Sequence, residues 1–197
     1  MKKRKRMAKA KAPSIRPNER KFRELMIFIA RRSESDPYFG AIKLNKLLFY
    51  SDFLAYLKLG KPITGQEYFA LANGPAPRYM VPIRDRMISD GDIAVQKKET
   101  YSGVQERTIA LREPEVRQFT PQEIDLVTRV ILNFSKRTGV ELSEISHKFA
   151  GWQWAAEKET IPYAVALVGN RPPTRNEVLR GMKLEATAAA CLAETGR

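Results

Sequence analysis

The sequence predicts a mainly α-helical α+β fold, a compact helical domain with a small β-hairpin. Long segments carry apolar residues every three or four positions, which is the helical period, and only residues 93–111 show two alternating runs around a turn. Helical segments lie before and after this hairpin and do not alternate with strands, which argues against a parallel sheet. The 197 residues are 43% hydrophobic, enough for one buried core with tails.

Three helices are expected before the hairpin. Asn18 can cap a helix that runs to about Arg32 and places four apolar side chains on one face: Phe22, Leu25, Met26 and Ile29. Residues 41–59 form a second helix, ended by Gly60. Its apolar side chains cover more than one face, so it should be the central and most buried helix. A third helix covers residues 78–90.

A break separates the second and third helices. Residues 68–71 are a short apolar run, which favours a strand or an extended segment, and Asn73-Gly74-Pro75 follows. Gly74 precedes a proline and is therefore pushed away from helical geometry, while Asn73 tolerates left-handed geometry. We expect Gly74-Pro75 to fix a sharp chain reversal that places the third helix.

After the hairpin the chain becomes helical again. Thr120, Pro121 and Glu123 are typical of a helix start, with threonine as the cap and glutamate closing a capping box. This helix should continue to about Arg137, and Gly139 should end it.

Shorter elements complete the chain. Ser143 should cap a short helix, L-S-E-I-S-H-K-F, which precedes two tryptophans and a turn at residues 161–163. The last expected helix spans residues 174–193. Residues 19–168 are thus expected to form the folded domain, and residues 169–197 a helical C-terminal extension.

The net charge of +13 is concentrated near the N-terminus. Residues 1–12 hold seven lysines and arginines and no acid, which is more than half of the excess charge. Such a run repels itself and attracts polyanions without reading sequence, so residues 1–18 are expected to be a disordered basic arm. The arm either adds solubility or contacts nucleic acid nonspecifically through Lys2, Lys3, Arg4, Lys5 and Arg6.

Few residues are suited to catalysis or metal binding. The chain has one histidine, His147, and one cysteine, Cys191, which excludes internal disulfides and paired-Cys zinc sites. No phosphate-binding loop, dinucleotide fingerprint or nucleophile elbow is found. We therefore expect no enzyme, no cofactor and no metal. The alternative of a hidden enzyme would need His147 and Cys191 together, although Cys191 lies among small residues typical of packing.

The sequence carries no sign of a membrane segment. No apolar run reaches about 18 residues, and the charged N-terminus is not followed by the apolar stretch of a secretory signal. Together with the single cysteine, these features predict a reduced, cytoplasmic protein without membrane contact.

Residues 121–154 follow the order of a helix-turn-helix, to which the hairpin could add a wing. The second helix carries two acidic residues, Glu141 and Glu144, and one basic residue, Lys148. A recognition helix normally presents Arg, Lys, Asn or Gln to the edges of the DNA bases. A DNA-binding transcriptional regulator that uses this segment and the basic arm is therefore the alternative function and ranks second.

Several short motifs follow one another in a fixed order. They are K-L-N-K-L-L-F-Y (43–50), G-K-P-I (60–63), N-G-P (73–75), and then L-S-E-I-S-H (142–147), Trp152 and I-P-Y (161–163). Their order and spacing resemble the Panacea domain, the SocA-like antitoxin domain also found in phage-associated GepA-like proteins. The pattern of that family reads K-L-x-K-L-L-Y-Y, G-K-P-L, Y-G-P and L-S-x-x-S-H…W…I-P-Y. The resemblance spans roughly residues 20–168, and Asn73 departs from it because the family often has an aromatic residue or a lysine there.

The resemblance implies a non-enzymatic protein. Panacea members are associated with bacterial and phage toxin–antitoxin pairs and look like neutralising antitoxins that bind unrelated toxins directly; the SocA-like prototype also acts as a proteolytic adaptor. This chain is therefore expected to be an antitoxin with a cognate toxin as its partner. The sequence leaves the toxin and the oligomeric state open.

The motif positions are the expected partner-binding residues: Lys43, Asn45, Lys46, Tyr50, Asn73, Gly74, Pro75, Ser146, His147 and Trp152. The alternative for each of them is a role in the fold. We expect the 43–50 helix in the core with its two lysines and Asn45 on a polar face, and Trp152 packed near His147. If part of this surface holds the toxin, the binding energy should concentrate in a few Tyr, Trp and Arg side chains.

Overall fold

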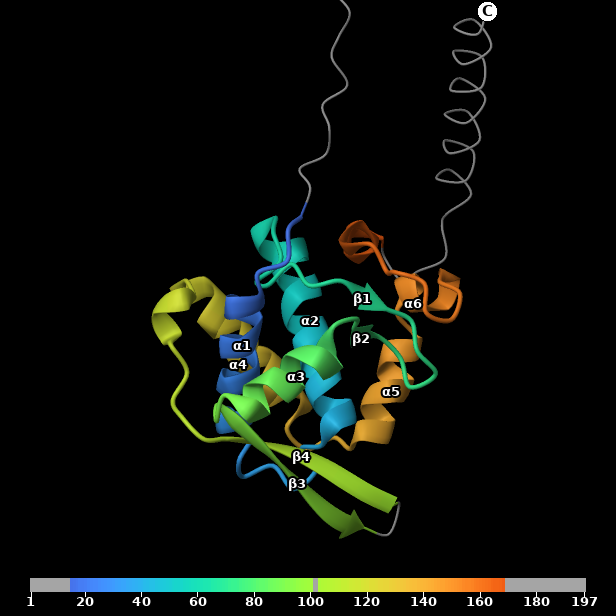
Figure 1. Cartoon of the computed structure of the whole chain (residues 1–197). Coiled ribbons are helices and arrows are strands. Elements are labelled where there is room, and N and C mark those ends of the chain that lie inside the picture. The colour runs from blue at the N-terminus through green and yellow to red at the C-terminus, as the bar shows by residue number, and fades with distance from the viewer. Residues whose placement is uncertain (1–14, 101–102, 169–197) are drawn as a thin grey trace, which may run out of the picture. The chain divides into compact units, whose positions relative to one another are not determined.

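The computed structural model describes residues 15–100 and 103–168. These residues form six α-helices: α1 (Glu19–Arg32), α2 (Ala41–Leu59), α3 (Met80–Ser89), α4 (Pro121–Phe134), α5 (Gly139–His147) and α6 (Ala150–Trp154). Two antiparallel two-stranded sheets pair β1 (Tyr68–Phe69) with β2 (Ala76–Pro77) and β3 (Ile93–Thr100) with β4 (Gly103–Ala110). Short 3-10 turns follow at η1 (Val116–Gln118) and η2 (Tyr163–Leu167). The predicted mainly helical α+β class is confirmed (Figure 1).

The described residues up to Leu167 form one compact unit. The first 14 residues of the expected basic arm and the expected helix over residues 174–193 lie outside the described residues. Within the described ranges no helix is long and apolar enough to cross a membrane.

Helix α2 is the centre of the core, as its wide apolar surface predicts. It contacts α1, α4, α5 and η2, and Figure 1 shows it between α1 and α5. Phe49 and Phe53 on α2 stack with each other at a centroid distance of 4.3 Å, and both also contact the rings of Tyr68 and Phe149. Tyr163 of η2 packs on Phe53 at 4.7 Å. These aromatic contacts join the two halves of the chain around one helix.

The helix ends largely follow the predicted capping residues. The Asn18 side chain accepts a hydrogen bond from the backbone N–H of Lys21, which starts α1. Gly60 adopts the left-handed conformation (φ 75°) that ends α2. Thr120 and Glu123 form the predicted capping box of α4. That helix ends at Phe134, three residues earlier than expected.

The predicted start of α5 is wrong. Thr138 caps the helix, because its side chain accepts from the backbone N–H of Glu141 while the Glu141 carboxylate accepts from the backbone N–H of Thr138 at 2.7 Å. Gly139, expected to end the preceding helix, lies in the first turn of α5 and close against Ile42. Ser143 is consequently a buried residue inside the helix and not its cap.

The β3–β4 hairpin is the larger sheet, and it pairs in register from Ile93↔Ala110 to Thr100↔Gly103. Arg107 on β4 donates to the backbone carbonyls of Ser33, Glu34 and Asp36, so the hairpin is bonded to the loop between α1 and α2. The guanidinium also lies over the Phe39 ring. The hairpin thus holds the α1–α2 connection in place.

Candidate functional site

The loop at residues 71–75 brings most of the predicted site residues together. Four of its backbone carbonyls accept hydrogen bonds from side chains that lie far away in sequence. Lys46 Nζ donates to Pro75 O (3.0 Å), Ser143 Oγ to Asn73 O (3.0 Å), and Trp152 Nε1 to Leu71 O (2.9 Å). His147 Nε2 lies 3.1 Å from Ala72 O. We call Lys46, Ser143, His147 and Trp152 the loop-holding cluster.

Gly74 is the point of closest approach in this loop. It has φ 90°, a conformation that L side chains rarely adopt. A Cβ atom built on it would lie 2.2 Å from Ser146 Oγ and 2.9 Å from Lys46 Nζ. Ser146 is fully buried and donates to the Ser143 carbonyl at 2.8 Å. Glycine is therefore required both by the backbone geometry and by the space that Lys46 and Ser146 fill.

Lys46 is buried, which contradicts its expected place on a polar face. Its side chain is 1% exposed, and the Pro75 carbonyl is its one hydrogen-bond partner among the described residues. Burial lowers the pKa of Lys46 to about 7 because the apolar surroundings disfavour the ammonium ion. The amphipathic pattern could not predict this, because the acceptor is a backbone carbonyl that no side-chain pattern reveals.

Lys43 is equally buried and is also wrongly placed by the sequence analysis, but it serves a different site. Its ammonium lies 2.5 Å from the Asp36 carboxylate and donates to the carbonyls of Ser135 (3.1 Å) and Arg137 (2.7 Å). These two carbonyls follow α4, so Lys43 satisfies acceptors at the C-terminal end of that helix. Lys43 does not join the loop-holding cluster.

Asn45 and Tyr50, the remaining predicted positions on α2, are partly buried and lie outside the cluster. Tyr50 packs against Phe134 at a centroid distance of 5.0 Å, and burial raises the pKa of its hydroxyl to about 12. The Asn45 Oδ1 atom is buried and has no hydrogen-bond partner among the described residues. Both residues are packed around α2, and within the described ranges neither forms a hydrogen bond to the loop.

His147 and Trp152 form a stacked pair, as expected from their proximity in the motif. Their ring centroids are 4.0 Å apart at an interplanar angle of 18°. Each ring also bonds to a carbonyl of the loop, so the stack fixes the loop from one side. The imidazole, the indole, the Ser143 hydroxyl and the Lys46 amine all bond to backbone. These four side chains hold the 71–75 loop in place, and their polar groups are used in the hydrogen bonds to it.

Sequence reasoning missed a second buried polar site on α2. The Asp52 carboxylate is fully buried and accepts from Thr64 N (2.7 Å), Thr64 Oγ1 (2.5 Å) and Tyr68 OH (2.8 Å). Burial raises the pKa of Asp52, although the hydrogen bonds from Thr64 and Tyr68 oppose the shift. The available signal was an acid in the middle of an apolar helix. Asp52 ties the turn after α2 to the core.

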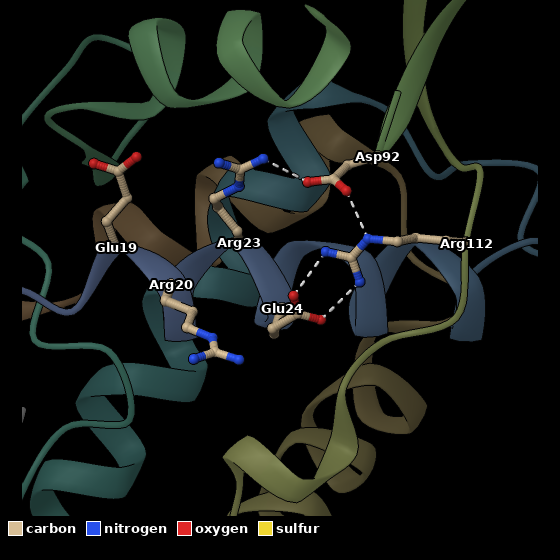
Figure 2. Close-up of a pocket in the computed structure, with 6 residues that line it drawn as sticks. All are labelled: Glu19, Arg20, Arg23, Glu24, Asp92 and Arg112. Carbon is tan, nitrogen blue, oxygen red and sulfur yellow. Dashed lines mark hydrogen bonds and ion pairs between the residues drawn. The ribbon is translucent and has the colours of Figure 1, made fainter. Parts of the chain in front are cut away.

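A third polar site occupies a cavity of about 360 Å³ beside α1. Figure 2 shows Arg112 between Glu24 and Asp92, with Arg23 pointing toward Asp92. Arg112 lies 2.7 Å from Glu24 and 2.6 Å from Asp92, and Arg23 lies 2.6 Å from Asp92. Burial acts to raise the pKa of Asp92, but the two arginines outweigh it and lower that pKa. The charges neutralise one another, so this site joins the hairpin to α1.

The geometry of α4 and α5 bears on the alternative DNA-binding role. On α5 the exposed residues include Val140, Glu141, Glu144 and the following Lys148. Two carboxylates on this surface would face DNA phosphates unfavourably if α5 entered a groove. The described structure therefore offers no support for α5 as a recognition helix.

Comparison with known proteins identifies the family. Residues 44–153 match the family model described as Antitoxin SocA-like, Panacea domain. The matched range contains all four donors of the loop-holding cluster and the loop that they hold. No match is found among curated proteins or among solved structures. The match covers more than half of the chain, and the chain therefore belongs to the SocA-like antitoxin family with a Panacea domain.

Proposed function

We propose that this protein is the antitoxin of a bacterial or phage toxin–antitoxin pair and neutralises a cognate cytoplasmic toxin by direct, non-catalytic binding. The family match over residues 44–153 carries the proposal. The polar groups of the motif support a binding role, because they are bonded to the 71–75 loop and hold it in place. A rigid surface presented by a packed domain suits stoichiometric binding, since less conformational entropy is lost on association.

The predicted partner-binding positions divide by burial under this proposal. Lys43, Lys46, Gly74, Pro75 and Ser146 are buried in the free protein. We propose that they shape the binding surface from beneath. Substituting them should weaken neutralisation together with stability, whereas substituting a residue in direct toxin contact should weaken neutralisation alone.

Co-expression with the immediate genomic neighbour tests the proposal. The neighbour is induced alone and together with this protein, and growth is measured. The complex is then purified at moderately high salt, which removes polyanions from the basic arm and spares a hydrophobic interface. We expect growth inhibition by the neighbour alone, relief by this protein, and a stoichiometric complex.

Two further variants separate toxin binding from DNA binding and from catalysis. Deleting residues 1–12 removes the basic arm and should leave neutralisation intact if the folded domain binds the toxin. The double variant His147→Ala with Cys191→Ala tests the hidden enzyme, and its full activity would dispose of that alternative. Failure of the well-expressed protein to relieve a toxic neighbour, with a salt-resistant DNA complex instead, would favour the regulator.

A further inference from the structure

An open groove lies between the C-terminal half of α2 and the helix α4, away from the loop-holding cluster. Its volume is about 590 Å³, within the range of sites that bind ligands or side chains. Five of the side chains that line it are aliphatic, Leu54 and Leu59 on α2 and Leu126, Val130 and Leu132 on α4, and the other five are polar. Its residues are all outside the predicted partner-binding set. We call it the α2–α4 groove.

Two leucines of the groove expose aliphatic surface that the core does not use. Leu132 is 66% exposed and Leu59 36% exposed, whereas Leu126 and Val130, which also line the groove, belong to the buried core. Single exposed leucines are ordinary, but a concave surface lined by leucines from two adjacent helices is typical of an interaction site.

The charges at the rim favour an acidic partner. Arg129 is already paired with Asp125 at 3.0 Å, one helical turn earlier. Lys58 is exposed, and within the described ranges no carboxylate pairs with it. The groove therefore presents one cation without a counter-ion beside its aliphatic floor. A partner that places a carboxylate there gains electrostatic complementarity as well as apolar contact.

The walls favour a helix over a strand as the occupant. A strand that adds to a protein needs a free sheet edge for its backbone hydrogen bonds, and both walls here are helices whose central backbone groups are bonded internally. A helix satisfies its own backbone groups and offers aliphatic side chains at helical spacing to a hydrophobic groove.

We propose that the α2–α4 groove docks an amphipathic helix of the cognate toxin. Its aliphatic side chains enter between Leu54 and Leu132, and a carboxylate on its flank meets Lys58. This inference rests on the proposed antitoxin function for the source of the helix. The shape and charge of the groove do not depend on that function, and the experiment therefore tests the groove and the antitoxin function separately.

Two groove variants and one matched control form the test. Leu132→Glu places a charge on the apolar wall, and Lys58→Glu reverses the rim charge. Leu167→Glu changes a leucine of nearly equal exposure, 62%, on η2 and serves as the control. Because Leu132, Lys58 and Leu167 are exposed, all three variants should unfold at the same urea concentration as the parent.

Two binding readouts are measured on the full chain. One is the complex with the protein encoded by the neighbouring gene, together with growth rescue. The other uses a labelled synthetic helix of roughly 15 residues with leucines at i, i+3, i+7 and i+10 and glutamates on its flank, followed by fluorescence anisotropy. A second peptide carries lysines in place of the glutamates.

We expect Leu132→Glu to weaken both interactions by at least about 30-fold, because it puts a charge in place of the most exposed leucine of the groove. Lys58→Glu should weaken them by about 5- to 10-fold and reduce the preference for the acidic peptide. The Leu167→Glu control should bind like the parent.

The other outcomes separate the two proposals. A neighbour complex and rescue that survive Leu132→Glu overturn the groove as the toxin site and leave the antitoxin function standing. Acidic-peptide binding that is lost in Leu132→Glu, without any neighbour complex in the parent, supports the groove and counts against the antitoxin function. Absence of both interactions in the parent overturns both proposals.

Discussion

Lys43 and Lys46 lie one turn apart on α2 and are equally buried, yet the regions around them differ. Lys43 meets the Asp36 carboxylate and two carbonyls beyond α4, whereas Lys46 meets, among the residues that the structure describes, the Pro75 carbonyl alone. In the first region Lys43 of α2 forms an ion pair with the α1–α2 loop, and in the second Lys46 forms a hydrogen bond with the 71–75 loop. Burial lowers the pKa of Lys46 because no carboxylate compensates it. Two lysines of one motif thus hold two different parts of the fold.

Replacing Lys43 should give the largest loss of stability in this comparison. Lys43→Met keeps the length of the side chain and removes the charge, which leaves the Asp36 carboxylate buried without its partner. We expect the free energy of unfolding to fall by about 4 kcal/mol, as for other broken buried ion pairs. Urea unfolding followed by circular dichroism measures it, with exposed Lys148→Met as the control. A loss below about 1 kcal/mol would mean that water replaces Lys43 beside Asp36.

Gly74→Ala should give the second largest loss of stability, and it acts in the region around Lys46. The new methyl group would meet Ser146 Oγ at 2.2 Å and Lys46 Nζ at 2.9 Å, in a backbone conformation that favours glycine. Strain and overpacking together should cost about 3 kcal/mol of unfolding free energy. In the double variant with Ser146→Ala, the oxygen that clashes is absent, and part of the loss should be recovered. A double variant no more stable than Gly74→Ala alone would place the cost in the backbone conformation and the Lys46 contact, and not in the clash with Ser146.

Lys46→Met should change the pH dependence more than the stability at neutral pH. Lys46 has a folded-state pKa of about 7 against an ordinary lysine pKa of 10.5, so between these pH values the unfolded state binds more protons. Stability from this group therefore rises as pH increases through that window, by about 2 kcal/mol between pH 7 and pH 9. Urea titrations of parent and variant across this range give the difference. Parallel curves would show that Lys46 is charged in the folded protein.

Trp152→Phe should have the smallest effect. Phenylalanine keeps an aromatic ring beside His147 but loses the N–H that donates to the Leu71 carbonyl. One lost hydrogen bond at a partly buried site should cost about 1 kcal/mol, measured as a lower midpoint of thermal unfolding. Trp154→Phe, at a 67% exposed position, is the matched control and should unfold like the parent.

Local signals in the sequence predicted most of the fold. Asn18, Gly60 and the Thr120–Glu123 box start or end helices as expected, because each acts through backbone groups within a few residues. The start of α5 was missed although Thr138 and Glu141 carry the same capping-box pattern as Thr120 and Glu123. The reason is Gly139, which directly follows Thr138: a glycine is also typical of a helix end, and we interpreted it as the end of the preceding helix.

The hydrogen-bond partners of the buried polar groups could not be predicted from the sequence. Periodicity marks which face of α2 is apolar, but it does not show that Lys46 reaches a carbonyl at Pro75 or that Asp52 accepts from Thr64. We predicted Ser146, His147, Trp152 and Gly74 as one site only because the motif pattern of the family contains all four. The α2–α4 groove left no signal, since Leu132 has the same helical spacing as a core residue.

The loop at residues 71–75 also sets an order of events in folding. Its carbonyl groups are synthesised long before their donors, which follow 70 residues later at Ser143, 75 at His147 and 81 at Trp152. Until α5 and α6 have been made and have docked, these carbonyls can bond only to water, to Lys46 at Pro75 and to the backbone N–H of Gly74 at Leu71. Contacts of such separation close late because the intervening chain must first be ordered. The full set of hydrogen bonds that hold this loop can therefore form only after synthesis has passed residue 152.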